Sequence, residues 1–230
     1  MDNRRKRQWN VTLIPIPADG LCFYHAILTN KSSKSNLYPF FKVIHAEYQK
    51  LLQTRGVKKN VNREKWILAM ELRAMVFQVT ENRVRNLLSS NTENKKKKVQ
   101  LKDILRRMQP SLGSNNSMNL ASYLNILSQF RHKISDPQGV GESCYAHSVD
   151  IESAAILLDT DIAVFDNGQG PSVYTRNGKQ VTLRNKKNGQ QDSSNTVYLH
   201  LKDMHFSLYP NKDTFYLSVK KSRVINLSSS

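Results

Sequence analysis

Apolar and polar positions recur along the chain with two different periods, and the period changes near residue 149. In the first part, apolar residues return every three or four positions, which is typical of amphipathic helices. This pattern predicts a helix over Phe40–Leu52 and a longer one over Arg63–Leu88. Shorter helices are expected over residues 99–108 and 118–130.

After that point, short apolar runs separated by turn residues predict β-strands. A helix from Val149 to Leu158 comes first, and Ser148 is its expected N-cap. Asn177-Gly178 lies between two of the runs and is a strong hairpin signal. One early strand is expected at Val11–Ile14, where Pro15 ends the run. The later strands are expected over residues 162–165, 172–175, 180–183, 196–201 and 206–209.

Helices followed by strands indicate an α+β protein with a small, mainly antiparallel sheet and one core that joins the two parts. A chain of 230 residues is long enough for one such core. We expect a basic, flexible start over residues 1–10 and a single domain over residues 11–222. Residues 223–230 are expected to be a tail or the end of a piece cut from a longer protein.

Two features of the sequence indicate an intracellular, cytoplasmic protein. Its two cysteines, Cys22 and Cys144, are too few for a disulfide scaffold. The charged start lacks the apolar segment of a secretory signal. The most apolar stretch, Trp66–Val79, contains Glu71 and Arg73, which argues against a membrane span.

The net charge of +17 hides an acidic segment. Residues 134–168 contain seven acidic residues and neither lysine nor arginine, whereas both flanking parts are basic. A strongly basic chain suggests nucleic acid or another acidic partner. The basic residues do not alternate with aromatic ones as a nucleic-acid stacking platform requires. We therefore expect the runs at residues 4–7 and 95–98 to be solvated faces or loops.

The stretch from Pro17 to Ile27 contains the most informative chemistry. An Asp19-Gly20 turn follows the early strand and places Cys22 at the start of a helix-compatible run. A cysteine at a helix N-terminus is favoured as thiolate, and the free N–H groups there are able to bind an oxyanion. A buried, inert Cys22 and a purely structural Asp-Gly turn are the alternatives.

A thiol nucleophile needs a base, and His205 is the best placed of the six histidines. It lies between two predicted strands, where a loop at a sheet edge is able to approach a helix N-terminus. His25 is near Cys22 in sequence, but in a helix its side chain would compete with core packing. No set of residues has metal-ligand spacing, and no glycine-rich phosphate loop is present, so we expect neither a metal nor a cofactor.

Three blocks of the sequence resemble the OTU (ovarian tumour) family of cysteine proteases, most of which are deubiquitinases. Residues 19–23 (DGLCF) are similar to the nucleophile motif. Residues 144–146 (CYA), 150–158 (DIESAAILL) and 162–165 (IAVF) are similar to the second block, a helix and a strand. Residues 197–201 (VYLHL) followed by His205-Phe206 are similar to the closing strand and its catalytic pair. The resemblance implies a papain-type fold with helices flanking the sheet.

The resemblance implies that Cys22 is the nucleophile and His205 the general base. Asp19 would shape an oxyanion site formed by the main-chain N–H groups of Gly20, Leu21 and Cys22. The family often has asparagine where Leu21 stands, and an acid or amide where this chain has Ser207 two residues after the histidine. Ser207 is therefore the candidate for orienting the imidazole. Asp203, another residue or a Cys–His dyad are the alternatives.

The implied substrate is ubiquitin, polyubiquitin or a ubiquitin-like modifier, bound by a monomeric enzyme. The tail of such a substrate is extended and carries arginines, which acidic residues would complement. For Asp150 and Glu152 the alternative is that they stabilise a helix start. The residues expected to bind substrate are Glu142, Tyr145, Asp150, Glu152 and Phe206.

Two other functions remain open. One is a basic nucleic-acid-binding module; the other is an inactive, OTU-like ubiquitin-binding protein, which the Ser207 departure would allow. The lysine- and asparagine-rich composition suggests an AT-rich genome, and an OTU-like domain in such a chain would fit a virus or an intracellular bacterium that edits host ubiquitin. In that case the protein would act in the host cytoplasm.

Overall fold

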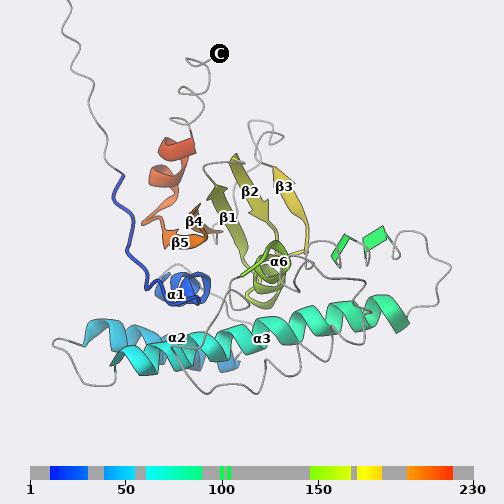
Figure 1. Cartoon of the computed structure of the whole chain (residues 1–230), viewed down its shortest axis with the longest axis horizontal. Helices are drawn as coiled ribbons and strands as arrows, with labels where there is room; N and C mark the ends of the chain where they lie inside the picture. Colours follow the sequence, from blue (N-terminus) through cyan, green and yellow to red (C-terminus); the bar gives the residue numbers. More distant parts are fainter. Residues whose placement is uncertain are drawn as a thin grey trace, which may run out of the picture.

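The computed structural model describes eight parts of the chain, drawn in colour in Figure 1. Two predicted helices, at residues 99–108 and 118–130, lie mostly or wholly outside the described residues, as do both basic runs. Glu142, Cys144 and Tyr145 lie outside them too. The described parts are residues 11–30, 39–54, 61–89, 99–100, 103–104, 146–166, 170–182 and 196–219.

The two long helices lie where the apolar period predicts them. Helix α2 is Pro39–Gln53 and helix α3 is Val61–Ser89. The run that begins with the candidate nucleophile forms α1, Cys22–Thr29, almost all of which is buried. Helix α6, Ser148–Leu157, begins the second part of the fold. A further helical segment at residues 212–219 was not predicted from the sequence.

Within the described parts, five strands form one sheet in the order β3-β2-β1-β4-β5. The strands are β1 (Asp161–Asp166), β2 (Gly170–Tyr174), β3 (Gln180–Thr182), β4 (Thr196–Lys202) and β5 (His205–Leu208). Only the β1–β4 pairing is parallel, so the expected mainly antiparallel sheet is confirmed. The predicted turn at Asn177-Gly178 joins β2 and β3, and Gly178 adopts a φ of 70°. The protein is thus α+β, as the order of elements predicted.

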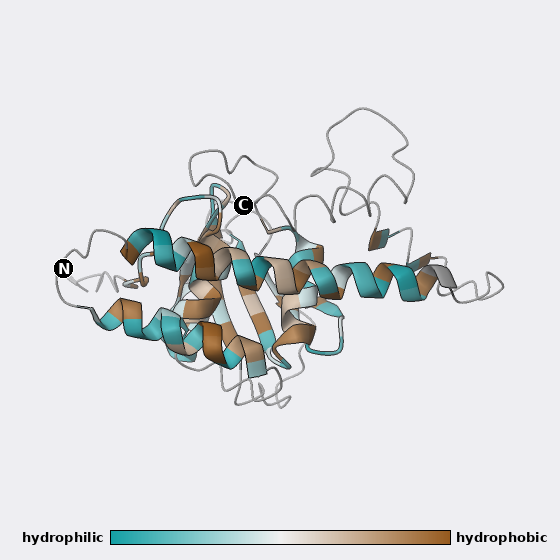
Figure 2. Ribbon diagram, turned by 90° about the horizontal axis from the view of Figure 1, so that it is seen from below, coloured by the Kyte–Doolittle hydropathy of each residue, from teal (hydrophilic) through white to brown (hydrophobic). Residues whose placement is uncertain are grey.

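The sheet separates two hydrophobic clusters. The larger cluster joins one face of the sheet to α1, α2, α3 and α6. Figure 1 shows α2 and α3 side by side below α1 and α6, with the strands above them. The smaller cluster covers the other face, where Phe215 of the segment 212–219 packs against Tyr198 of β4. Hydrophilic residues recur along the outward side of the long helices (Figure 2).

Two local predictions are wrong. Val11–Ile14 forms no strand; only Ile14 makes a single antiparallel bridge, to Leu208 at the free edge of β5. The N-cap of α6 is His147 and not Ser148. The main-chain N–H of His147 donates to Asp150 Oδ2 over 2.9 Å, which moves the helix start one residue earlier.

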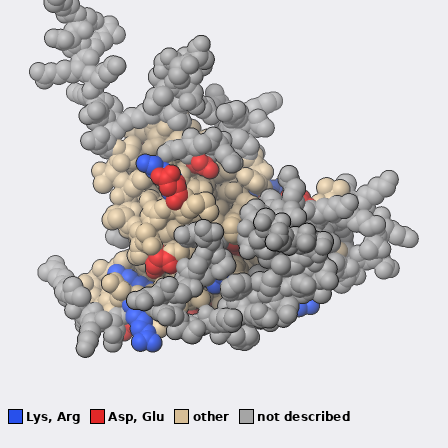
Figure 3. Space-filling view, viewed as in Figure 1, with Lys and Arg blue, Asp and Glu red and all other residues tan. Residues whose placement is uncertain are grey.

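None of the helices in the described parts combines the length and the apolar character that a membrane crossing requires. On the face shown in Figure 3, the Lys and Arg side chains of the described residues are scattered and form no continuous basic patch.

Candidate active site

A tight turn at Asp19-Gly20 leads the chain into α1. Gly20 has a φ of 81°, a conformation that glycine adopts at little cost. Asp19 Oδ1 accepts a hydrogen bond of 3.0 Å from the main-chain N–H of Leu21, which closes an Asx turn. The helix then begins at Cys22. Because the Leu21 N–H is bound to Asp19, it is no oxyanion donor here, and that expectation is corrected.

The Cys22 side chain lies against the outer edge of β5 and is only 3% exposed. Its sulfur accepts a hydrogen bond from the main-chain N–H of Phe206 at 3.4 Å. The thiol also donates weakly to the carbonyl of Met204, with Sγ 3.9 Å from the oxygen. Cys22 is a free thiol.

The electrostatic environment of the sulfur favours the neutral thiol. Burial raises the pKa of Cys22, while hydrogen bonds from the main-chain N–H groups of Phe206 and Phe23 lower it. The negative charge of Asp19 raises it further, and the net result is a raised pKa. The thiolate expected from the helix N-terminus is therefore not the dominant form in this state. The same N–H groups would stabilise a thiolate once a base has formed it.

His205 lies between the two residues that contact the sulfur. The β4–β5 hairpin turns at Asp203 and Met204, which have φ of 50° and 62°, and His205 is the first residue of β5. Phe206 N is bonded directly to the His205 carbonyl carbon, so that carbon lies within about 4.8 Å of Sγ. Among the described residues, the His205 ring makes no hydrogen bond to Sγ. The backbones are thus adjacent, while the imidazole is not yet paired with the thiol.

Side chains of β5 alternate between the two faces of the sheet. Phe206 and Leu208 belong to the larger cluster, and the Phe206 ring lies edge-on to Phe23 with centroids 5.3 Å apart. The expectation that Phe206 binds substrate is therefore wrong, because its ring fills the core. His205 and Ser207 share the other face. Ser207 pairs across the strands with His200.

The acidic residues of α6 turn inwards. Asp150 is 5% exposed, and its side chain accepts the N–H of His147. Glu152 is 2% exposed and forms an ion pair of 3.2 Å with Arg83 of α3. Both carboxylates have partners within the protein, Glu152 on α3 and Asp150 at the start of α6. Their expected role in substrate binding is corrected accordingly.

His25 has a different role from the one considered from the sequence. It is 1% exposed, and each of its ring nitrogens has a partner. Nε2 lies 2.8 Å from Asp19 Oδ2, and Nδ1 lies 2.7 Å from the hydroxyl of Tyr48 in α2. His25 is therefore not a base for Cys22. Sequence analysis missed the partnership because it depends on how α1 and α2 pack.

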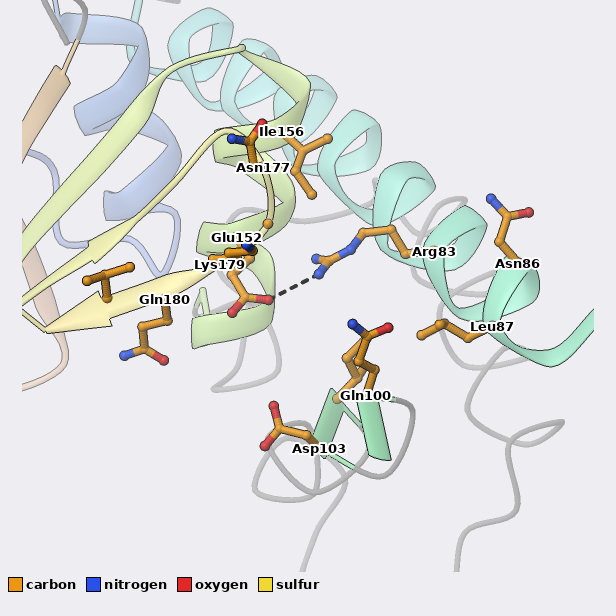
Figure 4. A pocket seen from close by; sticks show the side chains of 13 residues that line it. Arg83, Asn86, Leu87, Gln100, Asp103, Glu152, Ile156, Asn177, Lys179 and Gln180 are labelled. Atoms are coloured by element: carbon orange, nitrogen blue, oxygen red, sulfur yellow. Dashed lines mark hydrogen bonds and ion pairs between the residues drawn. The ribbon is translucent and has the colours of Figure 1, made fainter. Parts of the chain in front are cut away.

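A cavity of about 840 Å³ lies near the opposite edge of the sheet, between α3, α6 and the β2–β3 hairpin. Figure 4 shows the Arg83–Glu152 pair at this cavity, with Lys179 and Gln180 on the hairpin side. Its lining includes neither Asp19 nor Cys22 nor His205. The cavity is thus separate from the candidate site.

The described residues contain no group of three or more His, Cys, Asp or Glu side chains that could hold a metal ion. The chemistry available at Cys22 is that of a thiol, main-chain N–H donors and a nearby imidazole. No protein-family model matches the chain, and no curated protein sequence matches it either.

Proposed function

We propose that this protein is a cysteine isopeptidase of the OTU type that removes ubiquitin or a ubiquitin-like modifier from proteins. The observation that carries the proposal is the contact between Cys22 Sγ and the main chain of Phe206, residues 184 positions apart. It brings the first and the last of the three OTU-like sequence blocks together. A nucleophile on the first block and a base on the last block would need their segments to lie this close.

In the proposed reaction, the His205 imidazole takes the proton of Cys22 and the thiolate attacks the carbonyl carbon of the isopeptide bond. The C=O electron pair moves to oxygen, and main-chain N–H groups at the start of α1 stabilise the oxyanion. The C–N bond then breaks, and the imidazolium gives its proton to the leaving lysine amine. Water, deprotonated by His205, hydrolyses the thioester and regenerates the thiol.

The proposed enzyme rests with a neutral thiol and an unpaired imidazole. The main chain of β5 next to His205 already contacts Sγ, so we propose that a rotation of the His205 side chain pairs the ring with the sulfur during the reaction. Rotamer changes of partly exposed side chains are fast compared with ordinary turnover. Substrate binding over the β4–β5 turn would favour the paired arrangement.

The third member of the catalytic set is proposed to be Ser207. It shares a sheet face with His205 two residues earlier, so its hydroxyl is on the correct side of the strand. A serine stabilises an imidazolium less than a carboxylate does, so orientation of the ring would be its main contribution. Asp203 lies in the turn itself, with a φ of 50°, and is a less suitable partner.

The test is reaction with ubiquitin that carries a C-terminal vinyl electrophile. Wild-type protein should form a covalent adduct of one ubiquitin, and Cys22→Ala should form none. Cys144→Ala is the matched control and should react like wild type. Failure of wild type to form an adduct, or an adduct that persists in Cys22→Ala, would refute the proposal.

One observation favours a second candidate, an inactive ubiquitin-binding protein: the thiol has no imidazole partner among the described residues. Turnover separates the two functions. An active isopeptidase releases ubiquitin catalytically from chains or from a C-terminal fluorogenic amide. An inactive binding protein would bind ubiquitin chains with no release above that of the Cys22→Ala variant.

A further inference from the structure

Three polar side chains form a continuous hydrogen-bonded row beneath the turn that carries the candidate nucleophile. The row runs from Tyr48 in α2 through His25 in α1 to Asp19 in the turn, over distances of 2.7 and 2.8 Å. Tyr48 and His25 are each 1% exposed, whereas 30% of the Asp19 side chain is accessible. Buried polar groups need partners, and here every ring nitrogen of His25 has one.

In this row each group donates its hydrogen bond towards Asp19. An ionised Asp19 only accepts, so His25 Nε2 carries the proton of the 2.8 Å bond. On a neutral ring, Nδ1 is then the acceptor and the Tyr48 hydroxyl its donor. Burial raises the pKa of Tyr48 to about 12, which keeps the hydroxyl proton in place. The side chain of Thr29 lowers that pKa, as a donor to the phenolic oxygen would.

This row fixes the second oxygen of Asp19. The first oxygen already accepts the Leu21 N–H and closes the Asx turn. Water competes for a partly exposed carboxylate, so a single hydrogen bond from the Leu21 N–H holds the Asp19 side chain only weakly. With both oxygens bound, the carboxylate has one orientation, and so does the chain through Gly20 to Cys22. The N–H groups that follow the turn therefore have a fixed direction before substrate arrives.

We propose that His25, held by Tyr48, is a positioning residue that orients the oxyanion donors at Gly20 and Cys22 through Asp19. The inference rests on the proposed function, because an oxyanion forms only if the thiolate attacks a carbonyl. His25 touches neither the thiol nor the substrate. Its effect is confined to the step in which charge develops on the carbonyl oxygen.

Two substitutions of His25 distinguish the loss of its hydrogen bond to Asp19 from the loss of its packing in the core. The amide nitrogen of glutamine reaches about as far as Nε2, so His25→Gln keeps a donor to Asp19. Asparagine reaches only about as far as Nδ1, so His25→Asn keeps the Tyr48 contact and loses the donor to Asp19. Tyr48→Phe retains the ring and removes the hydroxyl that holds the imidazole. Thr80→Val is the control, since it breaks a buried hydrogen bond of 2.7 Å to Ser153 in another part of the core.

Two reactions of the full chain are measured in a Cys144→Ser background, together with the melting temperature. The first is hydrolysis of a fluorogenic C-terminal amide of ubiquitin, which passes through an oxyanion. The second is alkylation of Cys22 by iodoacetamide, a displacement at carbon that forms no oxyanion. Loss of donor alignment should therefore affect only the first reaction.

For His25→Asn we expect kcat to fall about 10- to 100-fold, with KM and the alkylation rate each within about threefold of wild type. His25→Gln should recover most of kcat, and Tyr48→Phe should give an intermediate loss. Thr80→Val should lower the melting temperature without separating the two reactions. If His25→Asn fails to fold, Tyr48→Phe and His25→Gln are compared instead. Tyr48→Phe should then lose more kcat than His25→Gln, with both alkylation rates near that of wild type.

Two results would overturn the inference while the proposed function stands: an active wild type with unchanged kcat in His25→Asn, or equal losses in hydrolysis and alkylation. An inactive wild type would instead refute the proposed function, and the positioning role would fall with it.

Discussion

The main-chain N–H of Phe206 donates to Cys22 Sγ over 3.4 Å, and this contact places the start of α1 against the outer edge of β5. The edge of a sheet normally exposes N–H and C=O groups that need partners. Here the thiol accepts the N–H of Phe206, and the main chain of Ile14 forms hydrogen bonds with both the N–H and the C=O of Leu208 further along the strand. The edge that would otherwise be free thus becomes the place where Cys22 meets the strand that carries His205.

The reactivity of Cys22 should depend on pH in a way that reflects its burial. Burial raises the thiol pKa above the ordinary value, so the thiolate fraction at neutral pH is small. The alkylation rate of Cys22 with iodoacetamide, measured in Cys144→Ser, should still be rising above pH 9. A plateau below pH 7 would show instead that a thiolate–imidazolium pair exists in the free protein.

The proposed roles of His205 and Ser207 predict unequal losses of activity. His205→Ala removes the base and the proton donor for the leaving amine, so kcat on a ubiquitin amide should fall by about 10³-fold or more. Ser207→Ala should cost less than about tenfold, because a hydroxyl only orients the ring. Ser207→Asn, which supplies an amide oxygen as acceptor, should match or exceed wild type. A loss in Ser207→Ala as large as in His205→Ala would show that the serine is indispensable.

Asp150 should make the protein less stable as the pH rises through the weakly acidic range. Burial raises its pKa to about 6 from 3.8, although the His147 N–H and the charge of Arg73 act in the opposite direction. Because the folded state holds this proton more tightly than the unfolded state, the contribution is complete below about pH 4. It is lost as the pH increases through 6, and amounts to on the order of 2–3 kcal/mol.

Urea unfolding at pH 4 and pH 7 checks this assignment. Asp150→Asn keeps an oxygen acceptor for His147 and removes the titration. The difference in unfolding free energy between the two pH values should therefore shift by that amount relative to wild type. An identical pH dependence in both proteins would contradict it.

The turn beside the thiol is strained at Met204. A φ of 62° is costly for a residue with a Cβ and free of cost for glycine. Met204→Gly should stabilise the protein by about 1 kcal/mol, which corresponds to roughly 2–4 °C in melting temperature. Met204→Ala is the control, since it removes the exposed side chain and keeps the strain. Equal melting temperatures for the two variants would show that the conformation carries no cost.

Most of the secondary structure follows from local patterns. The three- and four-residue apolar period located α2 and α3, and the Asn177-Gly178 turn located the β2–β3 hairpin. The segment at residues 212–219 was missed, because its apolar residues Phe215 and Val219 define a face only when they pack on the sheet. Val11–Ile14 has strand-like composition, but just one of its residues pairs with β5.

The candidate site was predicted in part. Cys22, Asp19 and His205 stood out because the residue types are chemically informative and occur in OTU-like blocks. The directions of the side chains did not follow from the sequence. The apolar Phe206 and the acidic Glu152 both have the chemistry of a substrate contact. Phe206 nevertheless points into the core from its face of the sheet, and Glu152 points inwards to its ion-pair partner on α3.

The sequence alone determined most of the segments that are helix or strand and which residues carry a thiol or an imidazole, since these depend on periodicity and on functional groups. The tertiary structure decided which of them meet. Only the packing of α1 on the edge of β5 sets Sγ beside residues 204–206, and only the packing of α2 on α1 gives His25 its two partners. Contacts between residues distant in the chain depend on how the elements fill a common core, and no local pattern encodes that arrangement.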